Sequence, residues 1–172
     1  LGKWITDPVN GSGQLLARVI VNRLWHYHFG QGLVKTPNDF GKIGSDPTHP
    51  ELLDWLSTQL IENNWQLGHI HKLILTSGTY RQKNSSSAKY MNIDSENRLL
   101  WHKKPHRLEA EIIRDRLLDV AGVLKKEMHG KSIPVGDYKK ALPDLPNSWR
   151  RSIYLQAHRS VHHPTLSLFN YP

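Results

Sequence analysis

The first residues whose types could support chemistry lie in the stretch from Ala17 to Gly41, which reads ARVIVNRLWHYHFGQGLVKTPNDFG. It predicts an apolar helix that carries a few polar side chains, ends at a glycine and leads into a turn with Asn and Asp side by side. Asn22, Arg23 and Asp39 are its candidates for lining a site. The Asn-Asp pair is equally typical of an Asx turn, in which a side chain bonds its own backbone. The stretch is therefore a candidate location for a site, without naming a reaction.

Arg18, Asn22 and His26 repeat every four residues, so they share one stripe of that helix. The stripe either faces water or forms a polar seam toward a cleft, with Asn22 and Arg23 fixing a loop. Because apolar residues flank it, we expect Arg18 and Asn22 to make hydrogen bonds inside the protein in preference to contacts with a substrate.

His71 lies on the apolar face of a helix predicted over residues 67–77, in register with Leu67, Ile70 and Ile74. We favour a core histidine with one hydrogen-bonded nitrogen. The alternative is a desolvated imidazole of lowered pKa that acts as a base or a ligand.

The longest helix is predicted over residues 107–126, with a core stripe of Ala110, Ile113, Leu117, Val120, Ala121 and Leu124. Glu111, Arg114, Asp115 and Leu118 lie together on another side. Charges this dense are typical of a solvated helix face. If they point at the first helix instead, Glu111 and Asp115 would pair with Arg18 or Arg23.

The hydrophobic periodicity predicts five helices in all, at about residues 14–29, 50–62, 67–77, 94–102 and 107–126. We expect Gly30 to cap the first helix, Thr48 and Glu51 to form a capping box before the second, and Asp94 to cap the fourth. A short strand at residues 153–155 is expected to pair with residues 132–135. The predicted fold class is mainly α: a single compact domain over residues 1–172, with about five helices, long loops and at most a short two-stranded β element near the C-terminal end.

Length and composition agree with a folded domain. The 172 residues suffice to bury a core, and the hydrophobic content of 38% is ordinary for a globular protein. No apolar run approaches the roughly 20 residues of a membrane span. The formal net charge is +8, but the basic residues are scattered, as in Lys103-Lys104 and Arg150-Arg151. This favours a solvated basic surface over a groove for polyanions, and nucleic-acid binding ranks last among our hypotheses.

No recognised catalytic or cofactor motif is present. The sequence has no cysteine, which removes disulfides, thiolate catalysis and Cys-ligated zinc. It also lacks a P-loop, a dinucleotide fingerprint, a G-x-S-x-G elbow and an H-E-x-x-H helix. His158, His162 and His163 have neither a nearby carboxylate nor a helix to place them on one face, so no metal site is predicted. No cofactor is predicted either.

The chain resembles a known family in six ordered segments: residues 17–41, THPELLDWL, HKLILTSGTYRQ, ENRLLW, RLEAEIIRD and RRSIYL. The family is the planctomycete-specific domain of unknown function (family 1553), which follows cytochrome-like domains in large exported bacterial proteins. The resemblance implies a mostly helical domain, a periplasmic or extracellular location and neighbours that bear haem or are associated with carbohydrate. The family continues past Pro172, which implies a fragment of a larger domain. The matching positions with chemical side chains are Asn22, Arg23, Asp39, His71, Arg81, Asn97, Arg98, Glu111, Arg114, Asp115 and Arg151.

The resemblance implies no established activity, and whether the protein is an enzyme stays open. Our first hypothesis is an accessory helical module of a large envelope or exported protein, whose partners are neighbouring domains of the same polypeptide, cytochrome-like ones among them. It rests on the scattered polar residues and on the lack of a catalytic motif.

The alternative is a hydrolase or lyase that acts on an anionic polysaccharide. Its catalytic candidates are His71, Asp39, Glu111 and Asp115, with His71 or a carboxylate of the Glu111–Asp115 pair as the base. Its substrate-binding candidates are Asn22, Arg23, Arg81 and Arg114, in which the guanidinium groups would hold an anionic group in a bidentate fashion. This hypothesis predicts that His71, Asp39, Arg81 and the Glu111–Asp115 pair converge on one pocket. Polyanion or nucleic-acid binding is the second alternative.

Overall fold

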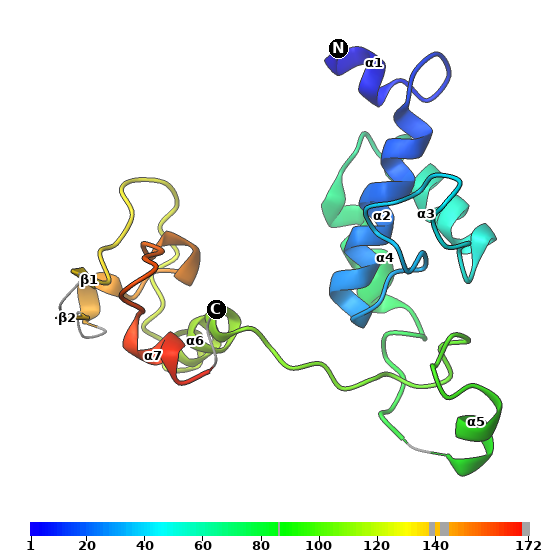
Figure 1. Cartoon of the computed structure of the whole chain (residues 1–172). Helices are drawn as coiled ribbons and strands as arrows, with labels where there is room; N and C mark the ends of the chain where they lie inside the picture. The colour runs from blue at the N-terminus through cyan, green and yellow to red at the C-terminus, as the bar shows by residue number, and fades with distance from the viewer. Residues whose placement is uncertain (86, 138–139, 142–144, 170–172) are drawn as a thin grey trace. The chain divides into compact units, whose positions relative to one another are not determined.

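The computed structural model describes residues 1–85, 87–137, 140–141 and 145–169, and over these residues the protein is mainly helical, as predicted (Figure 1). The chain divides into two compact units, residues 1–106 (unit 1) and residues 107–172 (unit 2). The expectation that residues 1–172 form one domain stays a prediction. Within the described ranges, no helix is both long and apolar enough to cross a membrane.

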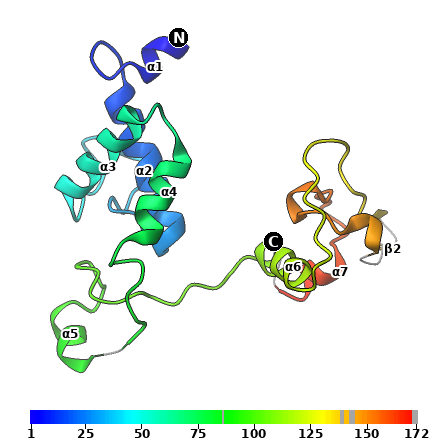
Figure 2. The same ribbon diagram turned by 180° about the vertical axis from the view of Figure 1, so that it is seen from behind.

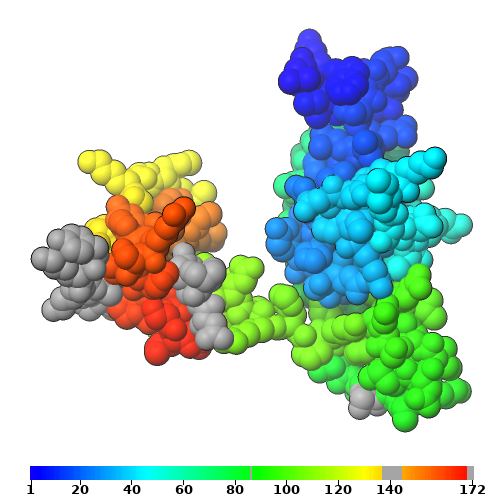
Figure 3. All heavy atoms as spheres, viewed as in Figure 1, coloured from blue at the N-terminus to red at the C-terminus, as the bar shows by residue number. Residues whose placement is uncertain are grey.

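Unit 1 is built from α1 (Gly2–Thr6), α2 (Gly13–Phe29), α3 (Pro50–Glu62), α4 (Leu67–Thr76) and α5 (Ala88–Ile93). Helix α2 packs against both α3 and α4, and the views from the front and from behind agree on this (Figures 1 and 2). Helix α1 and the loop after it project from one end of the unit, in dark blue in Figure 3. The buried core consists of Ala17, Val21, Trp25, Leu33, Val34, Leu53, Leu56, Leu60, Ile70 and Ile74.

Helix α2 confirms the helix predicted over residues 14–29 to within one residue. It ends at Gly30, which has a left-handed φ of 78° and whose N–H donates to the carbonyl of His26 at 2.7 Å. Glycine adopts this conformation without the steric cost of a Cβ. The predicted cap is therefore confirmed, and it turns the chain into the loop at residues 31–49.

The capping box predicted before α3 is wrong. The N-cap residue is His49, and it makes no side-chain capping hydrogen bond. Thr48 instead donates twice to the carbonyl of Leu33, from its amide at 2.8 Å and from its hydroxyl at 3.3 Å. The hydroxyl is thus used to fasten the loop after α2 to the start of α3, because a tertiary acceptor lies within its reach.

The helix predicted over residues 94–102 is also wrong, since α5 lies before Asp94. The carboxylate of Asp94 accepts hydrogen bonds from the amides of Arg98 and Leu99, at 2.9 and 2.8 Å. It therefore binds backbone N–H groups, as a cap would, but across a loop. Asn97 and Leu100 have left-handed φ values of 58° and 55°, which interrupt any helix in this segment.

Unit 2 is organised around α6 (Ala110–Val120), which is shorter than the helix predicted over residues 107–126. Among the described elements the longest is α2, with 17 residues, so the prediction that this helix is the longest is wrong. The chain leaves the helix at Gly122, which has a left-handed φ of 72°. The amides of residues 123 and 124 then turn back to the carbonyl of Leu118.

The buried face of α6 differs from the predicted core stripe. Ala110, Arg114 and Leu118 are buried, whereas Leu117 and Val120 are 56% and 80% exposed. Apolar residues occur on both sides of this helix, so its periodicity alone does not decide which side is covered. The expectation that the charged side is a solvated face is therefore wrong at Arg114.

The rest of unit 2 consists of short elements. Strands β1 (Gly136–Asp137) and β2 (Lys140–Ala141) form a short antiparallel pair, at a different place in the chain from the predicted pairing of residues 153–155 with residues 132–135. The predicted strand at residues 153–155 is instead largely a 3₁₀ turn, η2 (Ser152–Tyr154), and a parallel bridge joins Ile133 to Leu155. The unit also contains a second 3₁₀ turn, η1 (Pro146–Ser148), and α7 (Pro164–Ser167).

Candidate functional site

Asn22, a candidate substrate-binding residue, lies inside unit 1 with 0% of its surface exposed. Its Oδ1 accepts the N–H of Val34 at 2.8 Å, and its Nδ2 donates to the carbonyl of Val34 at 3.0 Å. Gly32 passes so close that a Cβ there would lie 2.7 Å from Oδ1 of Asn22. The side-chain amide of Asn22 thus holds the loop after α2 against the helix and presents no surface to a ligand. This agrees with the expectation that Asn22 makes its hydrogen bonds inside the protein.

The two arginines beside Asn22 are also engaged. Arg18 forms an ion pair with Asp54 of α3, which joins α2 to α3. Arg23 is exposed, and its Nη2 donates to Oδ1 of Asn38 at 3.2 Å. The expectation that Asn22 and Arg23 fix a loop is therefore confirmed for the loop at residues 31–49.

Asp39 organises a tight turn in the same loop. Its Oδ1 accepts the N–H of Gly41 at 2.9 Å, and its carbonyl accepts the hydroxyl of Thr36 at 2.8 Å. A Cβ at Gly44 would lie 2.2 Å from that carbonyl oxygen, so only glycine fits there without a shift of the backbone. These contacts support the turn role over the catalytic one.

His71 has a chemical partner that the sequence analysis missed. Its Nδ1 lies 2.8 Å from Nε2 of His28, at the end of α2, and the two rings meet edge to face. One nitrogen donates and the other accepts, so the tautomers of the two rings are coupled. No local sequence signal links these positions, which are 43 residues apart. The packing of α2 on α4 brings them together.

Lys103 completes a cluster with this pair. Its ammonium donates to the carbonyl of His28 at 2.7 Å and lies 3.7 Å and 4.5 Å from the ring centroids of Tyr80 and Phe29, which are favourable cation–π positions. Burial, followed by the charges of His71 and Lys103, lowers the pKa of His28 below its ordinary value of 6.5. Burial also lowers the pKa of Lys103. The cluster therefore favours a neutral imidazole at His28.

Arg114 and Asp115 hold the segment that contains η1 and η2. Arg114 is 1% exposed, and its guanidinium donates to the carbonyls of Arg150 and Ser148 at 3.0 and 2.9 Å, and to the hydroxyl of Ser152 at 3.2 Å. Oδ1 of Asp115 accepts both the amide and the hydroxyl of Ser152 at 2.7 Å. The guanidinium of Arg114 is thus committed to protein groups, and this leaves it unavailable for the anionic part of a substrate.

The remaining candidates do not form a site by themselves. Arg81 follows α4 and is exposed, with its backbone N–H bonded to the carbonyl of Ser77 at 3.2 Å. Glu111 is half-buried on α6. Arg81, Asp39 and His71 belong to unit 1, and Glu111 belongs to unit 2 with Asp115. Their convergence on one pocket stays a prediction.

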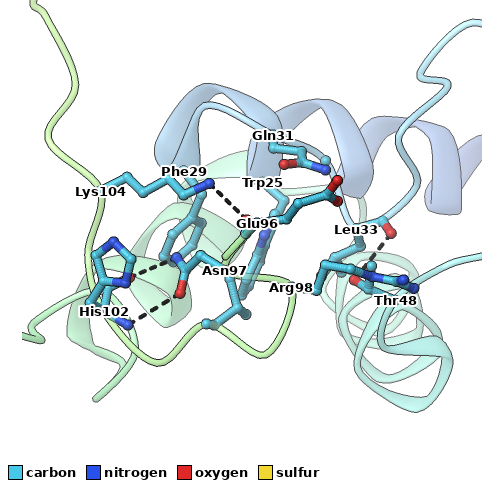
Figure 4. A pocket seen from close by; sticks show the side chains of 12 residues that line it. Trp25, Phe29, Gln31, Leu33, Thr48, Glu96, Asn97, Arg98, His102 and Lys104 are labelled. Atoms are coloured by element: carbon cyan, nitrogen blue, oxygen red, sulfur yellow. Dashed lines mark hydrogen bonds between the residues drawn. The ribbon is translucent and has the colours of Figure 1, made fainter. Parts of the chain in front are cut away.

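A narrow pocket opens beside the end of α2 in unit 1 (Figure 4). Trp25 and Phe29 form its apolar wall, and Asn97 lies opposite them with its amide bonded to the backbone of His102 at 2.9 and 3.3 Å. The ammonium of Lys104 donates to the carbonyl of Glu96 at 2.7 Å, so this loop is closed on itself. The pocket measures about 30 Å³, which is room for one or two water molecules and too little for a sugar unit.

Metal ligation was not predicted, and one of the three histidines that suggested it has another partner. Nε2 of His158 lies 3.1 Å from Oε1 of Gln156, and His163 precedes α7. Among the residues that the structure describes, no group of three or more His, Asp or Glu side chains is placed to hold a metal ion. That the chain takes no cofactor stays a prediction.

Comparison with known proteins places this chain in a family. No curated protein and no solved structure matches it. A match extends over residues 1–172, and therefore over both units, to the family PSD1, described as protein of unknown function (DUF1553). The chain belongs to this family and is an uncharacterised helical module of it.

Proposed function

We propose that the protein is an accessory, non-catalytic module that docks through α6 onto a neighbouring part of the same polypeptide. The observation that carries this proposal is the apolar stripe of Ile113, Leu117 and Val120, which follow one another at i, i+4 and i+7. Leu117 and Val120 are largely exposed although the helix is held in place by its buried residues. A contiguous apolar face on a well-held helix is typical of a surface that contacts another protein.

The use of the polar candidates inside the protein supports a non-catalytic role. Asn22 bonds to Val34, Asp39 bonds within its own turn, and Arg114 bonds to residues 148–152. A catalytic side chain must keep a donor or an acceptor free for the substrate. Asn22 and Asp39 direct these bonds at the backbone instead, and Arg114 directs its guanidinium at two backbone carbonyls and at the hydroxyl of Ser152.

The location and the neighbours are part of the proposal. We place the module in the periplasm or outside the cell, beside a cytochrome-like domain. The support is the resemblance of six ordered segments to domains found in large exported proteins. The full-length gene product tests this directly: a signal sequence and a haem-attachment motif are expected, and a product lacking both would contradict this part.

Docking through α6 is tested by measuring the affinity of the 172-residue chain for the purified neighbouring domain by calorimetry. The double variant Leu117→Ser with Val120→Ser is expected to lose most of the binding, because it removes the exposed apolar stripe. The matched control is Ile153→Ser, which removes a largely exposed apolar side chain of the same unit outside α6. Equal binding by the double variant and the wild type would end the proposal.

A hydrolase or lyase acting on an anionic polysaccharide is the second candidate, and the His28–His71 pair favours it. In the neutral tautomer whose Nδ1 donates to Nε2 of His28, the Nε2 of His71 carries a lone pair and can act as a base. Incubation with polygalacturonate or chondroitin sulfate, followed by analysis of the chain length of the polymer, tests this. Depolymerisation that is lost in His71→Gln is expected, and intact polymers would exclude it.

A further inference from the structure

Unit 1 carries a wider groove away from the His28–His71 pair and from the pocket of Figure 4. It lies between α2 and α3, close to the loop that precedes α2, and its volume of about 390 Å³ is within the range of small-ligand sites. Its polar lining consists chiefly of Gln14, Arg18, Asp54, Thr58 and Glu62, and Ile61 adds an apolar part.

The polar groups of the groove offer both donors and acceptors in fixed positions. Arg18 and Asp54 are paired across the two helices, so each orients the other. The hydroxyl of Thr58 donates to the backbone carbonyl of Asp54 at 3.0 Å, which leaves its oxygen free to accept. Oε2 of Glu62 accepts the amide of Gln59 at 3.2 Å. Side chains held in this way suit a ligand whose hydroxyl groups both donate and accept.

The same helix α3 also carries an exposed aromatic residue outside the groove lining. Trp55 is 50% exposed on α3, and it precedes Thr58 by three residues and Glu62 by seven. Side chains three residues apart are neighbours on a helix surface, so we expect Trp55 to lie next to the groove, although it is not one of the residues that line it. A half-exposed indole gives the C–H face of a sugar ring an apolar surface, while the hydroxyl groups reach the polar lining.

The charge of the groove selects among sugars. Asp54 and Glu62 carry two negative charges against the single positive charge of Arg18. The lining is therefore net negative in a chain whose formal net charge is +8. A uronate or a sulfate would meet two carboxylates and one guanidinium that is already paired, and it would be repelled. An uncharged sugar has no such cost.

We infer that this groove binds an uncharged sugar unit of a glycan. The inference does not depend on docking through α6, which belongs to the other unit. It also differs from the second candidate function, because an anionic polysaccharide would be excluded from this groove.

The experiment titrates the full 172-residue chain with neutral oligosaccharides and with their monosaccharides, and in parallel with galacturonate oligomers and spermidine. Binding is followed by calorimetry and by tryptophan fluorescence. Neutral oligosaccharides are expected to bind, galacturonate oligomers are not, and Trp55→Ala is expected to weaken binding about tenfold, the equivalent of one aromatic contact. Gln14→Ala and Glu62→Gln test the polar lining separately.

Tyr27→Ala is the matched control, because Tyr27 is an exposed aromatic residue of α2 outside the groove lining. It is expected to bind as the wild type does. Binding of oligosaccharides but not of monosaccharides supports a glycan chain as the source, whereas equal binding of both supports a free sugar. The inference is overturned if no neutral sugar binds, if spermidine or the galacturonate oligomers bind in its place, or if Trp55→Ala and Tyr27→Ala have the same affinity in folded protein.

Discussion

Replacing Asn22 by leucine removes both hydrogen bonds that Asn22 makes to Val34 while keeping the number and branching of the side-chain heavy atoms. Asn22 is 0% exposed and Val34 is 2% exposed, so water cannot replace either bond. A buried backbone group left without a partner costs about 1–3 kcal/mol, and the N–H and the carbonyl of Val34 are both affected. The free energy of unfolding is therefore expected to fall by about 4 kcal/mol.

Urea denaturation measures this loss. With a slope of about 2 kcal/mol per molar urea, a loss of about 4 kcal/mol lowers the midpoint by about 2 M. Hydrogen exchange at the amide of Val34 gives a local measurement, and we expect it to accelerate by about a thousandfold, since each 1.4 kcal/mol is about a factor of ten. The control is Asn38→Ala, which removes an exposed hydrogen bond to Arg23 and is expected to cost less than about 0.5 kcal/mol.

Asn22→Asp separates the two bonds. A carboxylate still accepts the N–H of Val34 but cannot donate to its carbonyl unless it is protonated. This variant is therefore expected to be unstable at neutral pH and to recover part of the loss as the pH falls. A midpoint that moves by less than about 0.5 M in Asn22→Leu, or a pH-independent loss in Asn22→Asp, would refute the reasoning.

Three further predictions concern other parts of the chain. Arg114→Ala is expected to destabilise unit 2 by about 3–5 kcal/mol in urea denaturation, because buried carbonyl groups lose a charged donor; a loss below about 1 kcal/mol would contradict this. The pKa of His28 is lowered in the folded protein, so below pH 6.5 the unfolded chain binds more protons than the folded one. The free energy of unfolding is therefore expected to fall as the pH drops below 6.5, and His28→Gln is expected to weaken this pH dependence. Equal pH profiles of the variant and the wild type would count against the cluster. Gly44→Ala is expected to lower the melting temperature, since its Cβ would lie 2.2 Å from the carbonyl oxygen of Asp39. In the control Gly68→Ala the Cβ has no atom within 4 Å, so this variant is expected to be neutral or stabilising. A lower melting temperature for Gly68→Ala than for Gly44→Ala would contradict this description of the turn.

Local patterns were sufficient where a helix has a single apolar side. The periodicity of α2, α3 and α4 identified their bounds to within a residue or so. Gly30 ends α2 as expected, because the left-handed conformation is a local property of glycine. In these cases the residue types and the tertiary structure agree.

The failures share a physical cause, which is competition between local and distant partners. Thr48 could cap α3 but donates to Leu33. Asp94 could begin a helix but accepts amides across a loop. In α6 the predicted apolar stripe around Leu117 is largely exposed, and Arg114 is buried instead. The reason is that the guanidinium of Arg114 finds its acceptors in a segment more than thirty residues away.

The sequence by itself determined that this is a mainly helical protein with a helical core, and it identified most of the polar residues that hold the structure. It did so because helix periodicity and glycine conformation are local. Only the tertiary structure decided which partners those polar residues bind and which side of α6 is exposed. It also brought His28 into contact with His71 and formed the groove between α2 and α3. The physical reason is that such a hydrogen bond or groove is formed by two segments far apart in sequence. The spacing of residues within one segment does not show which other segment packs against it.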